Sequence, residues 1–144
     1  GGEGEGEGEG EGEGEGEGEI ALERNLGADN TYVPGQPRDI TVTIAYSGTE
    51  PVLAVGLRER LPQGWDFVKL VSGALPATVI PRSPDGHTEF LWLAVPAFPI
   101  TFTYQVQVPL NAPAEEVIDG KVLYRQSGPE LSSPAITSTL LRAQ

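Results

Sequence analysis

The side chains that could carry out chemistry are few and scattered along the chain. The single histidine, His87, lies in the turn-like segment SPDGH. A catalytic histidine needs an activated nucleophile beside it, and no G-x-S-x-G segment supplies one. The chain contains no cysteine, which excludes disulfides, thiolate metal sites and cysteine nucleophiles. We therefore interpret His87 as an ordinary loop residue.

Carboxylates outside the first 19 residues could in principle form a glycosidase acid–base pair. Such pairs face each other across a cleft of about 5–10 Å, lined by aromatic rings that stack on sugars. Trp92 is centred in an apolar segment and is predicted to be core, whereas Trp65 follows the LPQG turn and either caps one end of the fold or binds sugar. We expect no enzyme activity. The candidate carboxylates are Glu59, Asp66, Glu89, Glu115 and Glu116.

Calcium is the most plausible ion, because hard cations bind clustered oxygen ligands. Asp29, Asn30 and Asp85 lie in turn-like segments that could supply such ligands. No D-x-D-x-D-G loop is present, and neutral turn formation is the alternative role for these residues. We expect no cofactor, with calcium as the one ion to test.

The first 19 residues, which hold ten Gly and nine Glu, alternate the two residue types up to Ile20. As an isolated segment this Gly-Glu tract should be a disordered acidic linker, because Gly maximises backbone entropy and Glu repels Glu. Its period of two is nevertheless that of a β-strand, with Gly on one face and Glu on the other. Two such strands could pack their Gly faces together, as silk-like sheets do. A perfect repeat could also stand in for an undetermined sequence.

A third interpretation is strand addition to a neighbouring copy. Nineteen extended residues span about 63 Å at ~3.3 Å each, which is longer than a small domain. Adding a strand to a sheet edge is a known recognition mode, and a head-to-tail contact of this kind produces a filament. Facing Glu side chains would each cost about 0.2–1 kcal/mol, so cations, acid pH or staggered packing would be needed. The predicted assembly residues are Glu3, Glu5, Glu7, Glu9, Glu11, Glu13, Glu15, Glu17, Glu19, Ile20, Leu22 and Leu26.

Charge and hydropathy exclude several partners. The tract carries nine of the 21 acidic residues, so the remaining 12 acidic and 9 basic side chains give residues 20–144 a net charge of only −3. No basic patch for nucleic acid and no polybasic segment for an anionic bilayer are present. No apolar run approaches the roughly 20 residues of a membrane span. The chain has no Met, even at position 1, which a removed signal peptide and an artificially trimmed sequence would explain equally well. We expect an extracellular or cell-surface location.

From Ile20 onward the chain predicts a single all-β domain, residues 20–144, behind the tract at 1–19. All 13 prolines fall in this part and leave little room for long helices. Between them lie short alternating segments typical of half-buried strands. AEEVID could form one helical turn, and EFLWLAV suggests a strand covered on both faces. We expect a two-sheet Ig-like β-sandwich of about 7–9 strands. The expected strands are ALERNL, DITVTIAYS, PVLAVGLRERL, WDFVKLV, EFLWLAV, ITFTYQVQVPL, GKVLYRQ and AITSTLLRA.

The order of these segments resembles the Ig-like β-sandwich repeat modules of bacterial and archaeal cell-surface proteins. The resemblance rests on TYVPGQPRDITVTI, LRERLPQGWDFV, FLW and ITFTYQVQVPLNAPAEEVIDGKVLY, and it covers about residues 21–142. Cohesin modules, a related sandwich, share its opening pattern. The resemblance implies a non-catalytic extracellular module and supplies no catalytic residue.

Together these observations predict a structural subunit of an extracellular filament or surface fibre. It would assemble with itself through its extended N-terminal segment, with Ile20, Leu22 and Leu26 as the first apolar anchors, either in the partner or in the domain's own first strand. The alternative is a carbohydrate- or protein-binding surface module on which the tract is a disordered linker. A polysaccharide or another cell-surface partner is compatible with either function.

Overall fold

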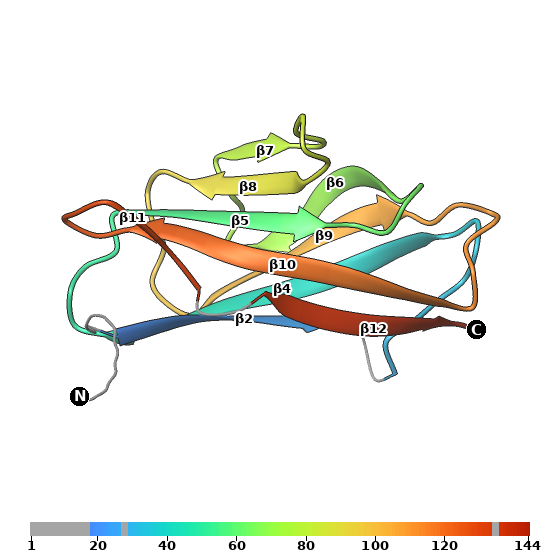
Figure 1. Ribbon diagram of the computed structural model, residues 1–144, viewed down its shortest axis with the longest axis horizontal. Helices are drawn as coiled ribbons and strands as arrows, with labels where there is room; N and C mark the ends of the chain where they lie inside the picture. Colours follow the sequence, from blue (N-terminus) through green and yellow to red (C-terminus); the bar gives the residue numbers. More distant parts are fainter. Residues whose placement is uncertain (1–17, 27–28, 134–135) are drawn as a thin grey trace.

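Two stacked β-sheets make up the structure, a computed structural model that describes residues 18–26, 29–133 and 136–144. Figure 1 shows the seven-stranded sheet lying over the four-stranded sheet. The four-stranded sheet has the order β2 (Gly18–Asn25), β4 (Pro37–Gly48), β9 (Ile100–Gln107) and β6 (Asp66–Gly73). The other has the order β3 (Thr31–Tyr32), β12 (Thr137–Ala143), β10 (Glu115–Arg125), β5 (Ala54–Arg60), β8 (Thr88–Trp92) and β7 (Thr78–Ile80), with β11 (Glu130–Ser132) paired to β10.

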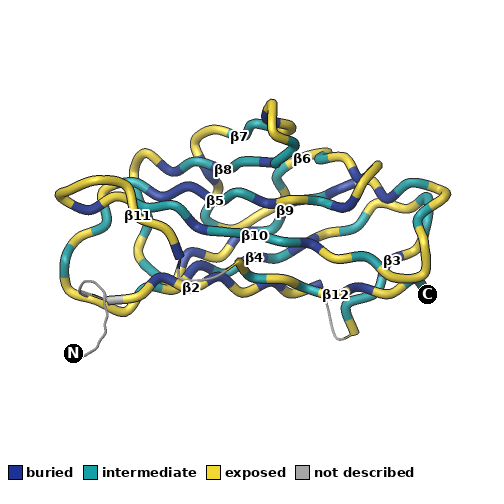
Figure 2. The backbone as a smooth tube through the Cα atoms, in the orientation of Figure 1, coloured by how far each residue is buried: buried dark blue, intermediate teal, exposed yellow. Residues whose placement is uncertain are grey.

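The core lies between the sheets and is built from strict alternation along the strands. On β4 the inward side chains of Ile40, Val42 and Ile44 are fully buried, and the residues between them are not. The strand β9 repeats this pattern with four inward residues from Ile100 to Val106, and Val108, just after its end, is also buried. Figure 2 shows the resulting alternation of buried and exposed backbone along both sheets. Apolar burial on one face of each sheet therefore holds the sandwich together.

Aromatic rings fill the centre of this core. Phe90 of β8 lies with its ring centroid 5.1 Å from that of Phe102 and 4.8 Å from that of Tyr104, both on β9. Trp92 packs edge-on against Phe102 at 5.2 Å and donates from Nε1 to the carbonyl of Ala74 at 3.0 Å. The prediction that Trp92 is a core residue is confirmed, and the cluster joins the two sheets across their interface.

The predicted all-β, two-sheet sandwich is confirmed, and all eight expected segments contain a strand. The estimate of about 7–9 strands was too low, since eleven strands are described. The additional strands β3, β7 and β11 span only two or three residues, too few to produce an alternating pattern.

Two local predictions were wrong. AEEVID does not form a helical turn, because β10 begins at Glu115 and pairs with β12 from its first residue. EFLWLAV is not covered on both faces: its strand ends at Trp92, and the next side chain, Leu93, is 74% exposed. Among the described residues there is no helix at all, and hence none that could span a membrane.

Replacing Phe102 with Ala should lower the free energy of unfolding by about 3–5 kcal/mol, because it leaves a cavity among packed rings. Leu93→Ala is the matched control and should change it by less than about 0.5 kcal/mol, since that side chain is largely in solvent. Urea unfolding followed by tryptophan fluorescence measures both values. Equal effects of the two substitutions would contradict the described core.

Candidate functional site

The first described strand, β2, begins at the end of the Gly-Glu tract. Inward and outward residues alternate along it, in step with the alternation of Gly and Glu in the tract sequence. Ile20, Leu22 and Leu26 point into the core and are 1%, 8% and 2% exposed. Glu19 and Glu23 lie on the opposite, exposed face. The sequence left open whether these apolar residues anchor in a partner or in the domain itself. In the structure they lie in the domain's own core, with Ile20 and Leu22 on β2 and Leu26 just after its end. The assembly role of these residues stays a prediction.

The last repeat of the tract is part of this strand. Gly18 and Glu19 open β2 and pair with Gly48 and Ser47, the last residues of β4. Because side chains alternate along a strand, Gly18 occupies the inward phase and Glu19 the outward one. The other predicted tract residues, Glu3, Glu5, Glu7, Glu9, Glu11, Glu13, Glu15 and Glu17, lie outside the described residues.

A buried ion pair fastens β2 to the opposite sheet. Arg24 occupies an inward position between Leu22 and Leu26, and its Nε and Nη2 donate to the two carboxylate oxygens of Glu59 on β5 at 2.9 and 2.6 Å. Both side chains have no exposed surface. A bidentate pair of this kind restricts position and orientation more strongly than a single hydrogen bond.

Further hydrogen bonds complete the cluster. The Arg24 Nη1 donates to the Ile118 carbonyl at 3.1 Å and to the Thr139 hydroxyl at 2.7 Å, which links β2 to β10 and β12. The Tyr104 hydroxyl of β9 donates to Glu59 Oε1 at 2.7 Å. The cluster therefore connects five strands from both sheets, and the buried charges have hydrogen-bond partners.

The protonation of the cluster follows from its burial. Burial disfavours the charge on Arg24, but the negative charge and hydrogen bonds of Glu59 outweigh this and raise the pKa of Arg24 above its usual value. Burial also raises the pKa of Tyr104 well above 10.0, and the adjacent Glu59 raises it further. At neutral pH Arg24 is charged and Tyr104 is a neutral hydrogen-bond donor.

A glycine on β10 provides the space for this cluster. A Cβ atom at Gly120 would lie 2.1 Å from Glu59 Oε2, 2.3 Å from Arg24 Nη2 and 2.8 Å from Leu22 Cδ2. Real Cβ atoms do not approach other atoms this closely, so any larger residue must displace the ion pair. Gly120 is therefore a functional position of the sheet interface that sequence reasoning did not single out.

The alternation of the sequence contains a signal for this ion pair. Glu59 falls on the apolar face of PVLAVGLRERL, and Arg24 has the same phase as Ile20 and Leu22. Opposite charges on two inward faces favour a buried pair. Glu59 was instead grouped with possible catalytic carboxylates.

Three of the other four carboxylate candidates pair with a basic side chain. Asp66 pairs with Arg82 at 3.2 Å, Glu89 with Arg58 at 3.3 Å and Glu115 with Arg142 at 2.8 Å. Glu116, the fourth, lies next to Glu115 on β10. The expectation that the chain is not an enzyme stays a prediction.

The turn around His87 is held together by its own polar groups. The Ser83 hydroxyl donates to Asp85, His87 Nδ1 lies 3.2 Å from Asp85 Oδ1, and Arg58 bonds to the same carboxylate. These hydrogen bonds, led by that from Ser83, hold the pKa of Asp85 well below its usual range. The interpretation of His87 as a loop residue fits this arrangement.

The proposed calcium ligands also have roles in turns. Asn30 has a φ of 51°, and its side-chain oxygen accepts from the Leu26 amide at 3.3 Å. Asp29 accepts from the Thr31 hydroxyl at 3.0 Å. Within the described part of the chain no group of three or more His, Asp or Glu side chains could hold a metal ion. Calcium binding stays a prediction.

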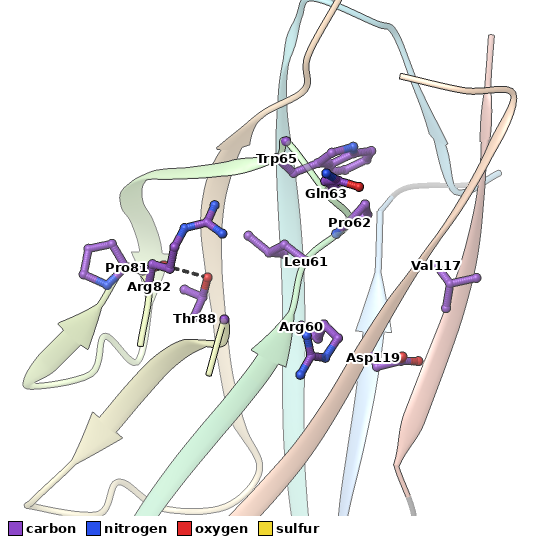
Figure 3. Close-up of a pocket in the computed structure, with 12 residues that line it drawn as sticks. Arg60, Leu61, Pro62, Gln63, Trp65, Pro81, Arg82, Thr88, Val117 and Asp119 are labelled. Carbon is purple, nitrogen blue, oxygen red and sulfur yellow. Dashed lines mark hydrogen bonds between the residues drawn. The ribbon is translucent and has the colours of Figure 1, made fainter. Parts of the chain in front are cut away.

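Trp65 is buried at one end of the sandwich. It is 1% exposed and packs edge-on against Tyr32, with ring centroids 5.0 Å apart. Its expected capping role fits this position, and it has no exposed face for a sugar ring. Beside it a hollow of about 370 Å³ is lined by Arg60, Leu61 and Arg82, among others (Figure 3).

Comparisons with known proteins identify the fold. No family model matches the sequence, and no curated protein matches it. A cohesin module from a Clostridium perfringens family 33 glycoside hydrolase is similar in structure, with a TM-score of 0.62 and 13% identity over 88% of this chain and 96% of the cohesin. The sixth cohesin of Acetivibrio cellulolyticus scaffoldin B, solved with a dockerin, is similar with a TM-score of 0.61 and 10% identity over 88% of this chain and 99% of that cohesin. The major pilin SpaD of Corynebacterium diphtheriae matches with TM-score 0.58 and 13% identity, over 85% of this chain and 34% of the pilin.

These similarities confirm the expected resemblance at the level of the β-sandwich fold, since identities of 10–13% show the fold alone. No family model supports the specific repeat family that the sequence pattern suggested.

Removing one partner of the ion pair should be costly. Arg24→Met leaves Glu59 buried and unpaired and should lower the free energy of unfolding by about 3–5 kcal/mol. The double variant Arg24→Met/Glu59→Leu removes both charges and should recover most of this loss. Chemical denaturation of both variants and the parent measures the difference. A double variant as unstable as the single one would show that lost packing, not the unpaired charge, dominates.

Stability should also fall at alkaline pH because of Tyr104. Its pKa is raised in the folded state, so its contribution is fully present below the unfolded pKa of about 10 and is lost as pH rises above that value. The slope from this one group approaches about 1.4 kcal/mol per pH unit. Tyr104→Phe should flatten the decline in unfolding free energy between pH 10 and 12. An unchanged slope would contradict the assignment to Tyr104.

Proposed function

We propose that the chain is a structural subunit of an extracellular filament or surface fibre that assembles by donating its Gly-Glu tract to a neighbouring copy. The observation that carries the proposal is the start of β2. The final Gly-Glu repeat is already part of a strand there, and its glutamate, Glu19, is exposed. The same alternation throughout the tract suits it to pair as a strand.

Within the described part of the chain, β4 ends level with the start of β2. Gly18 pairs with Gly48, the last residue of β4, so β4 offers no further strand residue in line with β2 beyond that point. Residues 1–17 would span about 56 Å when extended at ~3.3 Å each. A neighbouring molecule can supply the missing main-chain partners. Repeated head to tail, this contact builds a filament.

The sandwich gives the donated segment a rigid base. The buried Arg24–Glu59 pair holds β2 against β5 of the opposite sheet. About a third of SpaD, a major pilin, has the same sandwich fold, which supports a fibre location. We extend that location to this chain as part of the proposal.

Deleting residues 1–17 should abolish self-association and leave the domain folded, because β2 remains intact. The sharper variant keeps all 17 residues but groups their Gly and Glu into two blocks, which preserves charge and length and destroys the period of two. Electron microscopy and light scattering should show fibres for the parent only. Fibres of equal abundance from the block variant would overturn strand donation and leave a generic acidic linker.

The tract also predicts a dependence on charge screening. Glu side chains that face each other across strands repel by about 0.2–1 kcal/mol per pair. Lowering the pH from 7 to about 4, near the ordinary Glu pKa, or adding Ca²⁺ should therefore increase the fibre fraction measured by sedimentation. Magnesium at equal concentration separates a specific calcium effect from screening. Fibres that form best at pH 9 without divalent cations would contradict a mechanism based on paired Glu strands.

A protein-binding surface module is the second candidate. The hollow beside Trp65 carries the exposed cations Arg60 and Arg82, and Asp119 lies at its edge (Figure 3). The scaffoldin cohesin with the same fold was solved in complex with a dockerin. The burial of Trp65 disfavours sugar stacking, so a protein partner is preferred within this candidate. A monodisperse monomer under all conditions above would favour it.

A further inference from the structure

We propose that the outer edge of β2, which pairs with no further strand among the described residues, is the surface on which a neighbouring copy's Gly-Glu tract is accepted, an inference that rests on the proposed function. The donor and the acceptor would then be consecutive parts of the same chain. Each molecule would donate its tract to the next molecule and would bind the tract of the previous molecule along the edge of its own β2.

The edge strands of the two sheets differ in how well they could pair with an added strand. The four-stranded sheet ends in β2 and β6. The ladder of β6 with β9 shifts register twice, after Phe67 and after Leu70, and such bulges disrupt edge pairing. By contrast, β2 pairs with β4 over eight consecutive residues without a shift. The outermost strands of the other sheet, β3 and β7, have two and three residues. Among the described residues β2 is therefore the longest regular edge.

The inner face next to β2 is incompletely covered. On β12, Leu141 points into the core and is fully buried. Thr137, Thr139 and Ala143 have the same phase but are only partly buried. Since β12 is paired with β3 only at its last two residues, most of it lies at the margin of its sheet. A strand added beside β2 would cover these side chains.

The two sheets approach closely at β2, and this close spacing suits an added strand with glycine on its inner face. Cα atoms of β2 approach those of β10 and β12 to within 8 Å, whereas packed sheets are usually about 10 Å apart. At Gly120 even a methyl group would meet Leu22 at 2.8 Å. The tract has hydrogen atoms in place of inward side chains, so its backbone can enter where an ordinary strand cannot.

The charged side chains near β2 and β6 differ in sign. Glu19 and Glu23 are exposed on the outer face of β2, on the side where the Glu row of an accepted tract would lie. They would repel the incoming tract. The β6 edge carries the exposed Lys69 instead, which would attract it. Backbone geometry therefore favours β2 and charge favours β6, so substitutions at the two edges distinguish them.

Site-directed cross-linking tests the acceptor directly, since the chain has no cysteine of its own. One copy carries Glu5→Cys, Glu9→Cys or Glu13→Cys in its tract, and a second, mass-tagged copy carries Ala21→Cys on the outer face of β2. Under assembly conditions, oxidation should join the two different copies for at least one tract position. Lys69→Cys on β6 is the matched control and should remain at the background level of an unrelated surface cysteine.

The charge variants give an independent readout. Glu23→Lys should lower the protein concentration needed for fibre formation about two- to fivefold, because it turns a repulsion at the acceptor into an attraction. Lys69→Glu should leave that concentration unchanged. Cross-links to Lys69→Cys, or fibres without cross-links to Ala21→Cys, would overturn the β2 acceptor and leave the proposed function standing. Absence of both fibres and cross-links would overturn the two together.

Discussion

The bidentate pair between Arg24 and Glu59 is the interaction on which the N-terminal part of the structure depends. Such a buried pair contributes little net stability against an apolar replacement, but it strongly penalises arrangements that separate its members. A one-residue slip of β2 would turn Arg24 to solvent and leave Glu59 buried alone. Gly120 leaves room for only this arrangement. The pair thus specifies the register of β2 more than it adds to the stability of the core.

Register matters here because β2 and the Gly-Glu tract are one continuous alternation. With Ile20, Leu22 and Arg24 inward, an extension of β2 as a strand through the tract would place its glycines in the inward phase and its glutamates in the outward one. A slip would reverse both faces and point carboxylates toward the narrow margin beside β12. In the proposed assembly, the ion pair in the core therefore controls which face the tract presents to the next molecule, although it lies outside the contact.

Alternation in the sequence was sufficient to predict the long strands and the two-sheet class, because burial on one face imposes a period of two. DITVTIAYS and ITFTYQVQVPL became the central strands β4 and β9 for this reason. Strands of two or three residues are set by their neighbours and leave no local pattern, so β3, β7 and β11 could not be predicted. AEEVID suggested a helical turn by composition, but pairing with β12 overrode that preference. The ion pair depends on contact between residues 35 apart in sequence, which alternation can suggest but not assign.

The composition of the tract disfavours an ordered strand unless a partner strand stabilises it. Fixing each residue costs about 1–2 kcal/mol of backbone entropy, and glycine has the most to lose. Each main-chain hydrogen bond contributes a net stabilisation of only about 0.5–1.5 kcal/mol, and repulsion between facing glutamates reduces this stabilisation. An isolated Gly-Glu strand is therefore unfavourable, and two tracts have little tendency to pair with each other at neutral pH. Only a preformed edge, which is already ordered and offers apolar surface to cover, shifts the balance. In the proposed assembly, the charges of the tract therefore make fibre formation depend on an acceptor strand and on the ions around it.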